Sequence, residues 1–336
     1  MSLLGQFRLR AERHIKLFRC LRKSAALRKR ITRTDSIRPR DVLAFVVLRN
    51  ELVRLPYFLD YYRAQGVRHF LMVDNGSDDG TAEYLEGQRD VSLWSTQASY
   101  KGASYGVDWL NHLLWLYGAG HWVLVLDVDE FLVYPFCDTR PLSALTDWLD
   151  SQGRHSFGAM LLDMYPKGPI SAQPYHSGQN PFEIARYFDA GNLSIRRNAR
   201  YQNLWIQGGV RQRVIMAAEP KAAPALNKTP LVRWSRAYAY ISSTHTILPR
   251  ALNKVYDDGG GELASGVLLH AKFLNTILAK THEELTRGEH YSDSREYHAY
   301  AASLTQSQNL WCTWSTEYIN WRQLEILGLM SKGDWA

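Results

Sequence analysis

Apolar runs of strand length alternate with amphipathic segments in the first half of the chain. Four runs predict strands buried on both faces: Val42–Leu48, His69–Val73, Val91–Trp94 and Trp122–Leu126. Apolar side chains spaced three to four residues apart predict intervening helices over Pro56–Gln65 and Gly106–Tyr117, with a short helix beginning at Thr81. Because strands separated by helices form right-handed crossover units, we expect an α/β fold with a mostly parallel central sheet and flanking helices.

The second half of the chain is less regular. A strand is predicted over Phe157–Leu162, ending in Asp163, and residues 165–208 are polar and predicted to be rich in loops. The remaining apolar patterns predict three strands and two helices: strands Gly209–Ala217, Tyr238–Ser243 and Gly266–His270, and helices Leu274–Arg287 and Tyr297–Leu304.

Polar clusters follow three of the predicted strands. They are Arg49-Asn50-Glu51, Asp74–Asp79 and Asp127–Glu130. In open α/β sheets, ligands bind at the carboxyl ends of the strands. The three clusters therefore predict a ligand site at this edge of the sheet.

Asp127 and Asp129 are the strongest candidates for chemistry. Two carboxylates at positions i and i+2, directly after a buried strand, can face one ligand, and hard oxygen ligands suit Mg²⁺ or Mn²⁺ that bridges to substrate phosphates. The alternative is an acidic surface turn. The apolar runs on both sides, Trp122–Leu126 and Phe131–Val133, favour the metal and diphosphate site.

Several motifs resemble those of known glycosyltransferases. Val73–Thr81 (VDNGSDDGT) looks like the V-D-D/N-G-S-x-D-G-T signature of family 2 glycosyltransferases, and Asp127–Phe131 (DVDEF) looks like their D-x-D. The D-x-D-E-F form and Val47–Glu51 are most similar to a branch that also resembles family 92. The resemblance continues through Gly208–Arg213, Pro230–Trp234 and Leu268–Leu274. It implies a GT-A fold, a nucleotide-diphosphate sugar donor, with a UDP-sugar most expected, and a divalent metal.

The resemblance also implies roles for individual residues. Asp74 or Asn75 matches the position that reads the base and ribose of the donor, and Arg49, Asn50 and Glu51 would line the same nucleotide pocket. Asp127 and Asp129 match the metal–diphosphate pair, with Glu130 orienting the site. A histidine from the second half often joins the metal in such enzymes, and His245 and His270 are the two candidates, each with a structural role as its alternative.

No clean acidic motif marks the catalytic base. An inverting transfer needs a carboxylate that takes the proton of the acceptor hydroxyl. Asp163 is our candidate, because its strand should end beside the strand that precedes the D-x-D motif, although a role as a helix cap or turn residue remains equally open. Asp189 is the alternative, and Glu219 is a third carboxylate of this region.

Basic and aromatic residues have two interpretations each. Five cations could bind the donor diphosphate or an anionic acceptor, or form surface ion pairs: Lys101, Arg211, Arg213, Lys228 and Arg233. Two preceding glycines, which allow close backbone approach, favour Arg211 and Arg213 as donor ligands. Six aromatic residues could stack on sugar rings or belong to the core: Tyr165, Tyr175, Trp205, Trp234, Trp311 and Trp314.

Positive charge is concentrated at the N-terminus. The whole chain of 336 residues carries a formal charge of +7. Residues 1–40 contain 13 Lys and Arg against Glu12 and Asp35, which leaves 27 basic and 31 acidic groups for the rest. An apolar stripe runs through this basic segment: Phe7, Ala11, Ile15, Phe18, Leu21 and Ala25, with Arg8, Arg19, Arg22, Lys23 and Lys29 around it. Such a helix suits an anionic membrane surface, and a solvated arm is the alternative.

The composition indicates which binding partners and which cellular compartment to expect. Nucleic acid is not expected, because the basic patch lies on a terminal arm and the body is acidic. Three cysteines far apart in the sequence form no disulfide framework and fit a reducing compartment, and no apolar stretch is long enough to span a membrane. We therefore expect a cytoplasmic protein at the inner face of the plasma membrane.

The patterns divide the chain into three parts. They are a basic amphipathic arm (1–40), a glycosyltransferase domain (41–290, with a nucleotide-sugar half over 41–135 and an acceptor half over 136–290) and a helical, aromatic extension (291–336). The expected function is metal-dependent transfer of a sugar to a cell-surface glycan or lipid-linked acceptor, with inversion implied by family 2 alone. The alternatives are a non-catalytic sugar- or nucleotide-binding protein and a membrane-surface scaffold. A nucleotidyltransferase is disfavoured, because Arg49-Asn50-Glu51 is not a glycine-rich phosphate loop.

Overall fold

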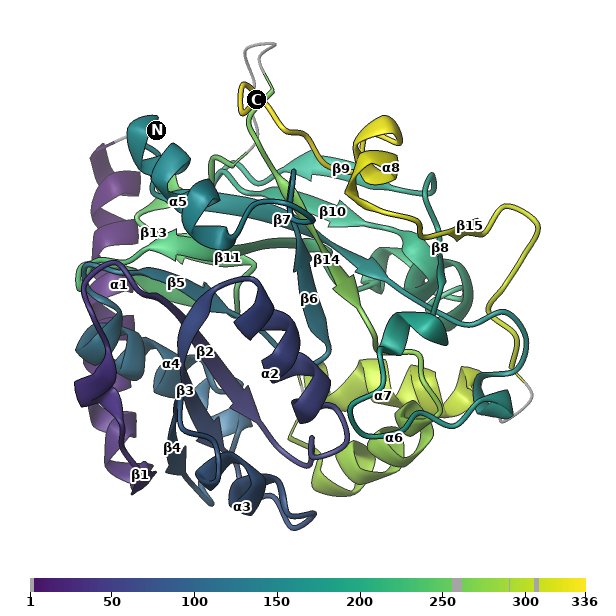
Figure 1. Cartoon of the computed structure of the whole chain (residues 1–336), viewed down its shortest axis with the longest axis horizontal. Helices are drawn as coiled ribbons and strands as arrows, with labels where there is room; N and C mark the ends of the chain where they lie inside the picture. Colours follow the sequence, from purple (N-terminus) through teal and green to yellow (C-terminus); the bar gives the residue numbers. More distant parts are fainter. Residues whose placement is uncertain (1–2, 256–261, 290, 305–307) are drawn as a thin grey trace.

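A nine-stranded sheet forms the centre of the molecule (Figure 1). The computed structural model describes residues 3–255, 262–289, 291–304 and 308–336, and within α7 the side chains from residue 296 onward. In spatial order the strands are β1 (Arg28–Ile31), β4 (Val91–Ser95), β3 (Val67–Asp74), β2 (Val42–Leu48), β5 (Trp122–Val125), β11 (Asn227–Arg233), β7 (Ser156–Asp163), β14 (Gly266–His270) and β6 (Glu130–Val133). The strands β4, β3, β2 and β5 are mutually parallel, as are β7 and β14, whereas β1, β11 and β6 run antiparallel to their neighbours.

Helices cover both faces of this sheet. Alternate residues of β2 enter different cores. Val42, Ala44, Val46 and Leu48 pack with α2 (Leu55–Ala64) and α5 (Leu142–Ser151). Leu43 and Phe45 point the other way and pack with α4 (Val107–Leu113). This arrangement confirms the predicted α/β fold with a central sheet and flanking helices, and it explains why the parallel strands are continuous apolar runs.

The remaining elements lie around this core. The other helices are α1 (Leu3–Lys23), α3 (Thr81–Glu86), α6 (Thr276–Arg287), α7 (Tyr291–Ser303) and α8 (Trp321–Ile326). Short strands form three small pairs: β9 (Ser194–Arg197) with β10 (Leu204–Gln207), β12 (Ala239–Ser242) with β13 (Thr246–Leu248), and β8 (Tyr187–Phe188) with β15 (Thr316–Glu317). Three of these short strands, β8, β9 and β10, lie in the segment expected to be rich in loops.

Two sequence predictions in this half need correction. Residues Gly209–Ala217 form no strand; a short helical turn spans Arg211–Ile215 instead, because Gly208 and Gly209 both adopt a positive φ that turns the chain. The strand that lies between β5 and β7 is β11, Asn227–Arg233. Pro230 interrupts the apolar pattern of this strand, so the periodicity of the sequence does not indicate a strand there.

Both ends of the chain pack onto the central unit. In the basic segment, α1 packs against α4, and β1 pairs with the edge strand β4, which the sequence did not predict. At the other end, Trp335 is buried against Tyr134, Phe136 and Trp148. Among the described residues, no helix has the length and apolar character required to cross a bilayer.

Candidate functional site

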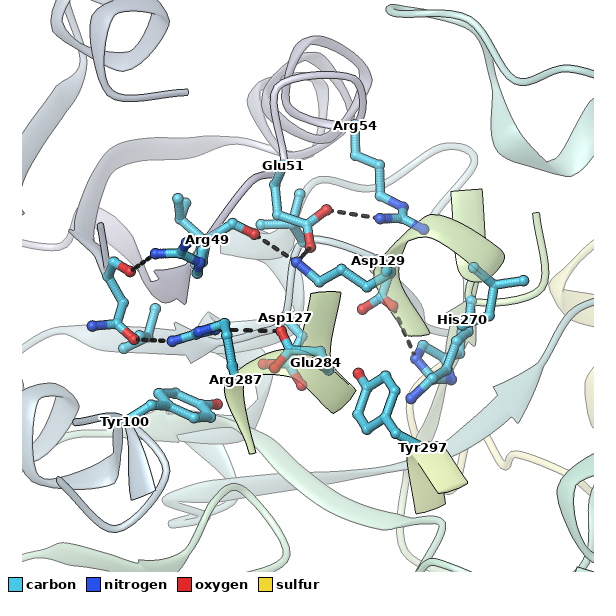
Figure 2. Close-up of a pocket in the computed structure, with 17 residues that line it drawn as sticks. Arg49, Glu51, Arg54, Tyr100, Asp127, Asp129, His270, Glu284, Arg287 and Tyr297 are labelled. Atoms are coloured by element: carbon cyan, nitrogen blue, oxygen red, sulfur yellow. Dashed lines mark hydrogen bonds and ion pairs between the residues drawn. The ribbon is translucent and has the colours of Figure 1, made fainter. Parts of the chain in front are cut away.

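A cavity of about 170 Å³ opens at the carboxyl ends of β2, β3 and β5 (Figure 2). Helices α6 and α7 form its opposite wall. Its lining includes Asp127, Asp129 and His270 from the sheet, Tyr100 from a loop, and Lys280, Glu284, Arg287 and Tyr297 from the two helices. The lining as a whole contains five Lys and Arg side chains, four Asp and Glu side chains and one histidine. Both signs of charge therefore face one cavity, which suits a phosphate-containing ligand together with a cation.

Arg49 joins the ends of β2 and β3 at one side of the cavity. Leu48 pairs with Asp74 in the parallel ladder, so the residues that follow each strand lie side by side. The Arg49 guanidinium donates to the carbonyl oxygens of Asn75 (2.9 Å) and Gly76. Asn75 lines the cavity and is itself fixed by its amide, which donates to the carbonyl oxygen of Ala98 at 3.0 Å. The polar clusters after β2 and β3 are therefore assembled into one wall, as their positions predicted.

Asp127 and Asp129 lie in the cavity, but each already has a cationic neighbour. The Asp127 side chain is 56% exposed and accepts from the Lys228 ammonium at 3.3 Å. Lys228 is buried and also contacts Glu130 at 2.5 Å. Burial lowers the pKa of Lys228, but the carboxylates of Glu130 and Asp127 outweigh it and raise the pKa. Burial raises the pKa of Glu130 to about 7, although Lys228 opposes the shift. Lys228 thus lies beneath the acidic loop, where it offsets the charge of these two carboxylates.

His270 bridges two aspartates behind the cavity. Its Nε2 lies 3.2 Å from Asp129 Oδ2, and its Nδ1 lies 2.6 Å from Asp163 Oδ1. Burial lowers the pKa of His270, but the two carboxylates outweigh burial and raise the pKa to about 9. Burial would raise the pKa of Asp129, yet His270 and Arg54 hold it well below its usual range. At neutral pH the group is therefore an imidazolium between two carboxylates.

Helix α6 supplies the cationic wall (Figure 2). The Lys280 ammonium donates to the carbonyl oxygen of Arg49 at 2.6 Å and lies 3.2 Å from Glu51. Arg287 donates to the side-chain oxygen of Asn75 at 3.0 Å. These contacts hold α6 across the strand ends. The sequence predicted the helix but not its part in the site, because no motif marks its charged residues.

The two histidines proposed as metal ligands lie in different places, one outside the cavity lining and one inside it. The Nδ1 of His245 lies 2.6 Å from the carbonyl oxygen of Asn227, and burial together with Lys228 lowers the pKa of His245 to about 4. His245 is absent from the cavity lining. His270 lines the cavity, where its Nε2 faces Asp129 and its Nδ1 faces Asp163.

Asp127 and Asp129 do fit a divalent cation that completes its coordination with substrate and water. Both side chains line the cavity and the first is largely open to it. Within the part of the chain that the structure describes, no three His, Cys, Asp or Glu side chains gather to hold an ion by themselves. Mg²⁺ commonly binds through one or two carboxylates plus substrate phosphates, which is the arrangement that this pair permits.

The two base candidates are buried in ion pairs outside the cavity lining. Asp163 accepts from Arg211 at 2.7 Å and contacts His270. Asp189 accepts two hydrogen bonds from Arg213, at 2.8 and 2.9 Å. Arg211 and Arg213, proposed as donor ligands, are thus the partners of the two proposed bases, and neither arginine lines the cavity. None of these four side chains is part of the cavity lining.

Only some of the other predicted binding residues line the cavity. Arg49, Glu51, Asn75 and Asp127 line the cavity, whereas Asn50, Asp74 and Lys101 lie outside its lining. Asp74 is buried and accepts from the Ser77 backbone at 3.2 Å, which shapes the turn after β3. Among the aromatic candidates, Tyr165 and Trp234 are buried in the core and Trp314 is exposed.

Comparisons with known proteins add little to this description. No family model matches the chain, and no curated protein matches it. Solved structures with partial likeness include a 4-diphosphocytidyl-2C-methyl-D-erythritol synthase, at 19% identity over 43% of this chain and 67% of that chain, with a TM-score of 0.25. Another is named "Putative Glucose-1-Phosphate Thymidylyltransferase from Bacillus anthracis in Complex with a Sucrose", at 9% identity over 86% and 95% of the two chains, with a TM-score of 0.29. Such low scores carry no conclusion about function, which has to be argued from the site.

Proposed function

We propose that this chain is a glycosyltransferase that moves a sugar from a nucleotide-diphosphate donor, with UDP-sugar the first candidate, to a glycan or lipid-linked acceptor. The observation that carries the proposal is the cavity at the carboxyl ends of β2, β3 and β5, where Asp127 and Asp129 face a wall of cations. Ligands bind at this edge in open α/β sheets. The glycosyltransferase-like motifs of the sequence contribute residues to the same cavity.

The nucleotide would lie against the wall formed by Arg49 and Asn75. Its diphosphate would then meet the cations of α6 and the β14 end, Lys280, Arg287 and Lys272, whose hydrogen bonds suit phosphate oxygens. In the present structure Arg287 and Lys280 bind protein acceptors in this space. Donor binding would replace those contacts with phosphate contacts.

A divalent cation held by Asp127 and Asp129 would neutralise charge on the departing diphosphate. Two cationic side chains of the protein stabilise the carboxylates of Asp127 and Asp129. His270 donates to Asp129 and keeps it ionised, and Lys228 offsets the charge that Asp127 and Glu130 bring together. In the transfer, the bond from the anomeric carbon to the diphosphate oxygen breaks, a bond to the acceptor oxygen forms, and the proton of the acceptor hydroxyl is released to water.

Asp163 acts in this proposal as a positioning residue rather than as the base. Its carboxylate is buried and divides its hydrogen bonds between Arg211 and His270. A carboxylate in such a pair has a depressed pKa, and Arg211 and His270 do lower the pKa of Asp163 against the effect of burial. Asp163 therefore orients His270, which in turn orients Asp129.

The test is donor turnover by purified protein. A panel of nucleotide sugars is incubated with Mn²⁺ and release of the nucleoside diphosphate is measured, with and without mixed glycan acceptors. We expect release from one nucleotide class, and Asp129→Asn should reduce it at least a hundredfold while a cooperative thermal unfolding transition shows that the variant is still folded. The matched control is Asp147→Asn, an exposed carboxylate on α5. Equal rates in Asp129→Asn and wild type would overturn the assignment of the site.

The acceptor belongs at a cell surface under this proposal. Transfer with inversion to a growing polysaccharide or lipopolysaccharide chain, at the inner face of the plasma membrane, would suit a protein with a strongly basic amphipathic N-terminal helix.

A further inference from the structure

Helix α1 exposes its apolar stripe to solvent. Five large apolar side chains of the helix are between 47% and 70% exposed: Leu4, Phe7, Ile15, Phe18 and Leu21. They recur at helical spacing and therefore lie along one face of a single helix. Exposure of large apolar side chains to water is unfavourable, and a continuous exposed row of them marks a binding surface. We therefore expect a binding partner to cover this stripe.

The opposite face of α1 is fixed to the body of the protein. Leu9 and Cys20 are buried there. Arg19 donates to Asp108 of α4 at 2.7 Å, and Glu12 accepts from Arg200 at 2.7 Å. The apolar stripe is thus held outward by contacts along the whole helix, and it cannot turn inward without breaking these ion pairs.

Positive charge flanks the stripe. Arg8, Arg10 and Arg22 are exposed on α1, and Lys29 and Arg30 follow on β1. The segment as a whole has 13 Lys and Arg and two acids, whereas the rest of the chain has more acids than bases. The charge of the occupant is therefore expected to be negative. A second copy of this chain is a poor match, because pairing two α1 stripes would bring two cationic rims together.

We propose that α1 docks in the plane of an anionic lipid bilayer. Phe7, Ile15 and Phe18 would enter the boundary between headgroups and acyl chains, while the flanking arginines contact lipid phosphates. Twenty-one residues give a helix of about 31 Å, and its charged residues place it along the surface. The proposal stands on α1 alone and does not depend on the glycosyltransferase assignment.

Docking would also fix the position of the cavity relative to the lipid. Arg19 donates to the carbonyl oxygen of Gly102 at 2.8 Å, and the Gly102 amide donates to Ser99. Tyr100, between these residues, lines the cavity. The docking helix and the cavity thus share one loop.

Vesicle flotation with the full chain tests the proposal. We expect the protein to float with phosphatidylglycerol-containing vesicles and to stay in solution with pure phosphatidylcholine vesicles. The variant Phe7→Glu/Phe18→Glu should lower the binding constant at least tenfold. The variant Arg8→Ala/Arg22→Ala should lower it about thirtyfold, since each basic residue near an anionic surface contributes a factor of about five.

A matched variant separates this helix from apolar exposure in general. Ile319→Glu/Ile326→Glu changes two equally exposed apolar residues near the C-terminus and should leave binding unchanged. Thermal unfolding verifies that each variant is folded. Equal binding to neutral and anionic vesicles, or full binding by Phe7→Glu/Phe18→Glu, would overturn the proposal. So would concentration-dependent dimerisation in light scattering that this variant abolishes, because the occupant would then be a second copy.

Discussion

Asp129 is supported by a chain of alternating charges that runs inward from the cavity. His270 lies between Asp129 and Asp163, Arg211 follows Asp163, and Glu296 lies 3.4 Å from Arg211. The three inner members, His270, Asp163 and Arg211, thus each have a partner of opposite sign on both sides. Removing one member leaves its neighbours uncompensated, which makes the chain testable at single residues.

Asp163→Asn tests whether this residue is a positioning group or a base. Because Arg211 and His270 each lose one of their two carboxylate partners, we expect the free energy of unfolding to fall by about 3 kcal/mol, measured by urea denaturation. Turnover should also fall, because the His270 ring is no longer held in place by Asp163. The variant His270→Gln should reproduce this loss of turnover. Unchanged stability together with a loss of turnover that His270→Gln does not share would make Asp163 the base.

The ion pairs of Glu296 predict that the free energy of unfolding decreases in acid. Burial raises its pKa, but Lys272 and Arg211 outweigh burial and lower the pKa to about 2, against an ordinary value of 4.5. Because the folded-state pKa is the lower one, its contribution is present above pH 4.5 and is lost as the pH falls through 2. The full shift corresponds to about 3 kcal/mol, and solvent contact at the side chain reduces the expected value below that.

Urea denaturation between pH 5 and 2 measures this contribution. The wild type should lose more stability over that interval than Glu296→Gln, which has no carboxylate to protonate. Parallel pH profiles for the two proteins would contradict the assigned ion pairs.

At the scale of elements, α6 is held over the cavity by polar contacts to β2 and β3. Glu283 accepts from Arg49 at 2.8 Å and from Asn50 at 2.8 Å, and Lys280 donates to the Arg49 carbonyl. These are partly exposed contacts, so they stabilise this position of the helix weakly compared with the apolar core. Such an element can open for a ligand without unfolding the sheet.

Glu283→Ala should loosen this helix selectively. It removes the acceptor that Arg49 and Asn50 share, and we expect amide hydrogen exchange over Thr276–Arg287 to become roughly tenfold faster, which corresponds to about 1.4 kcal/mol. His282→Ala, on the exposed side of the same helix, is the control and should leave the exchange nearly unchanged. Equal effects of the two substitutions would contradict the role of the Glu283 contacts.

The elements of the parallel sheet could be predicted because burial on both faces leaves a direct pattern. Val42–Leu48 is apolar throughout, and the structure shows β2 over the same residues. By contrast, Gly209–Ala217 has an apolar pattern of its own but begins after two glycines with positive φ, and the strand of this region is β11. The local apolar pattern does not predict the strand correctly there, because tertiary contacts determine which segment completes the sheet.

The site could be predicted only in part, for a similar reason. Asp127, Asp129, Arg49 and Asn75 follow strands whose ends meet, so the topology brings them together. The contacts of Lys280 and Arg287 arise when α6, some 150 residues beyond the D-x-D motif in the sequence, folds back over the strand ends. Asp163 was expected at the end of a strand beside the D-x-D strand, but β11 lies between β5 and β7, and Asp163 reaches the D-x-D motif only through His270. No sequence pattern indicates that Arg211 pairs with Asp163.

At the scale of the whole molecule, one sheet connects the elements that each proposal needs. Strands β2 and β5 end at the cavity, and β4 carries β1, which continues the segment that begins with α1 (Figure 1). A rigid central sheet therefore fixes the relative positions of the docking helix and the ligand cavity. This arrangement allows the lipid and donor proposals to be tested separately on one folded protein.

The central claim, a nucleotide-diphosphate site beside Asp129, is tested most directly by thermal unfolding of the full chain with a panel of nucleoside diphosphates, with and without Mn²⁺. A ligand that binds only the folded state raises the unfolding midpoint by mass action, with about 2.7 kcal/mol of stabilisation at a hundredfold excess over the dissociation constant. We predict a rise of the midpoint with one nucleotide, larger when Mn²⁺ is present, and no effect of Mn²⁺ on that rise in Asp129→Asn. No rise with any nucleotide, with or without the metal, would contradict the account.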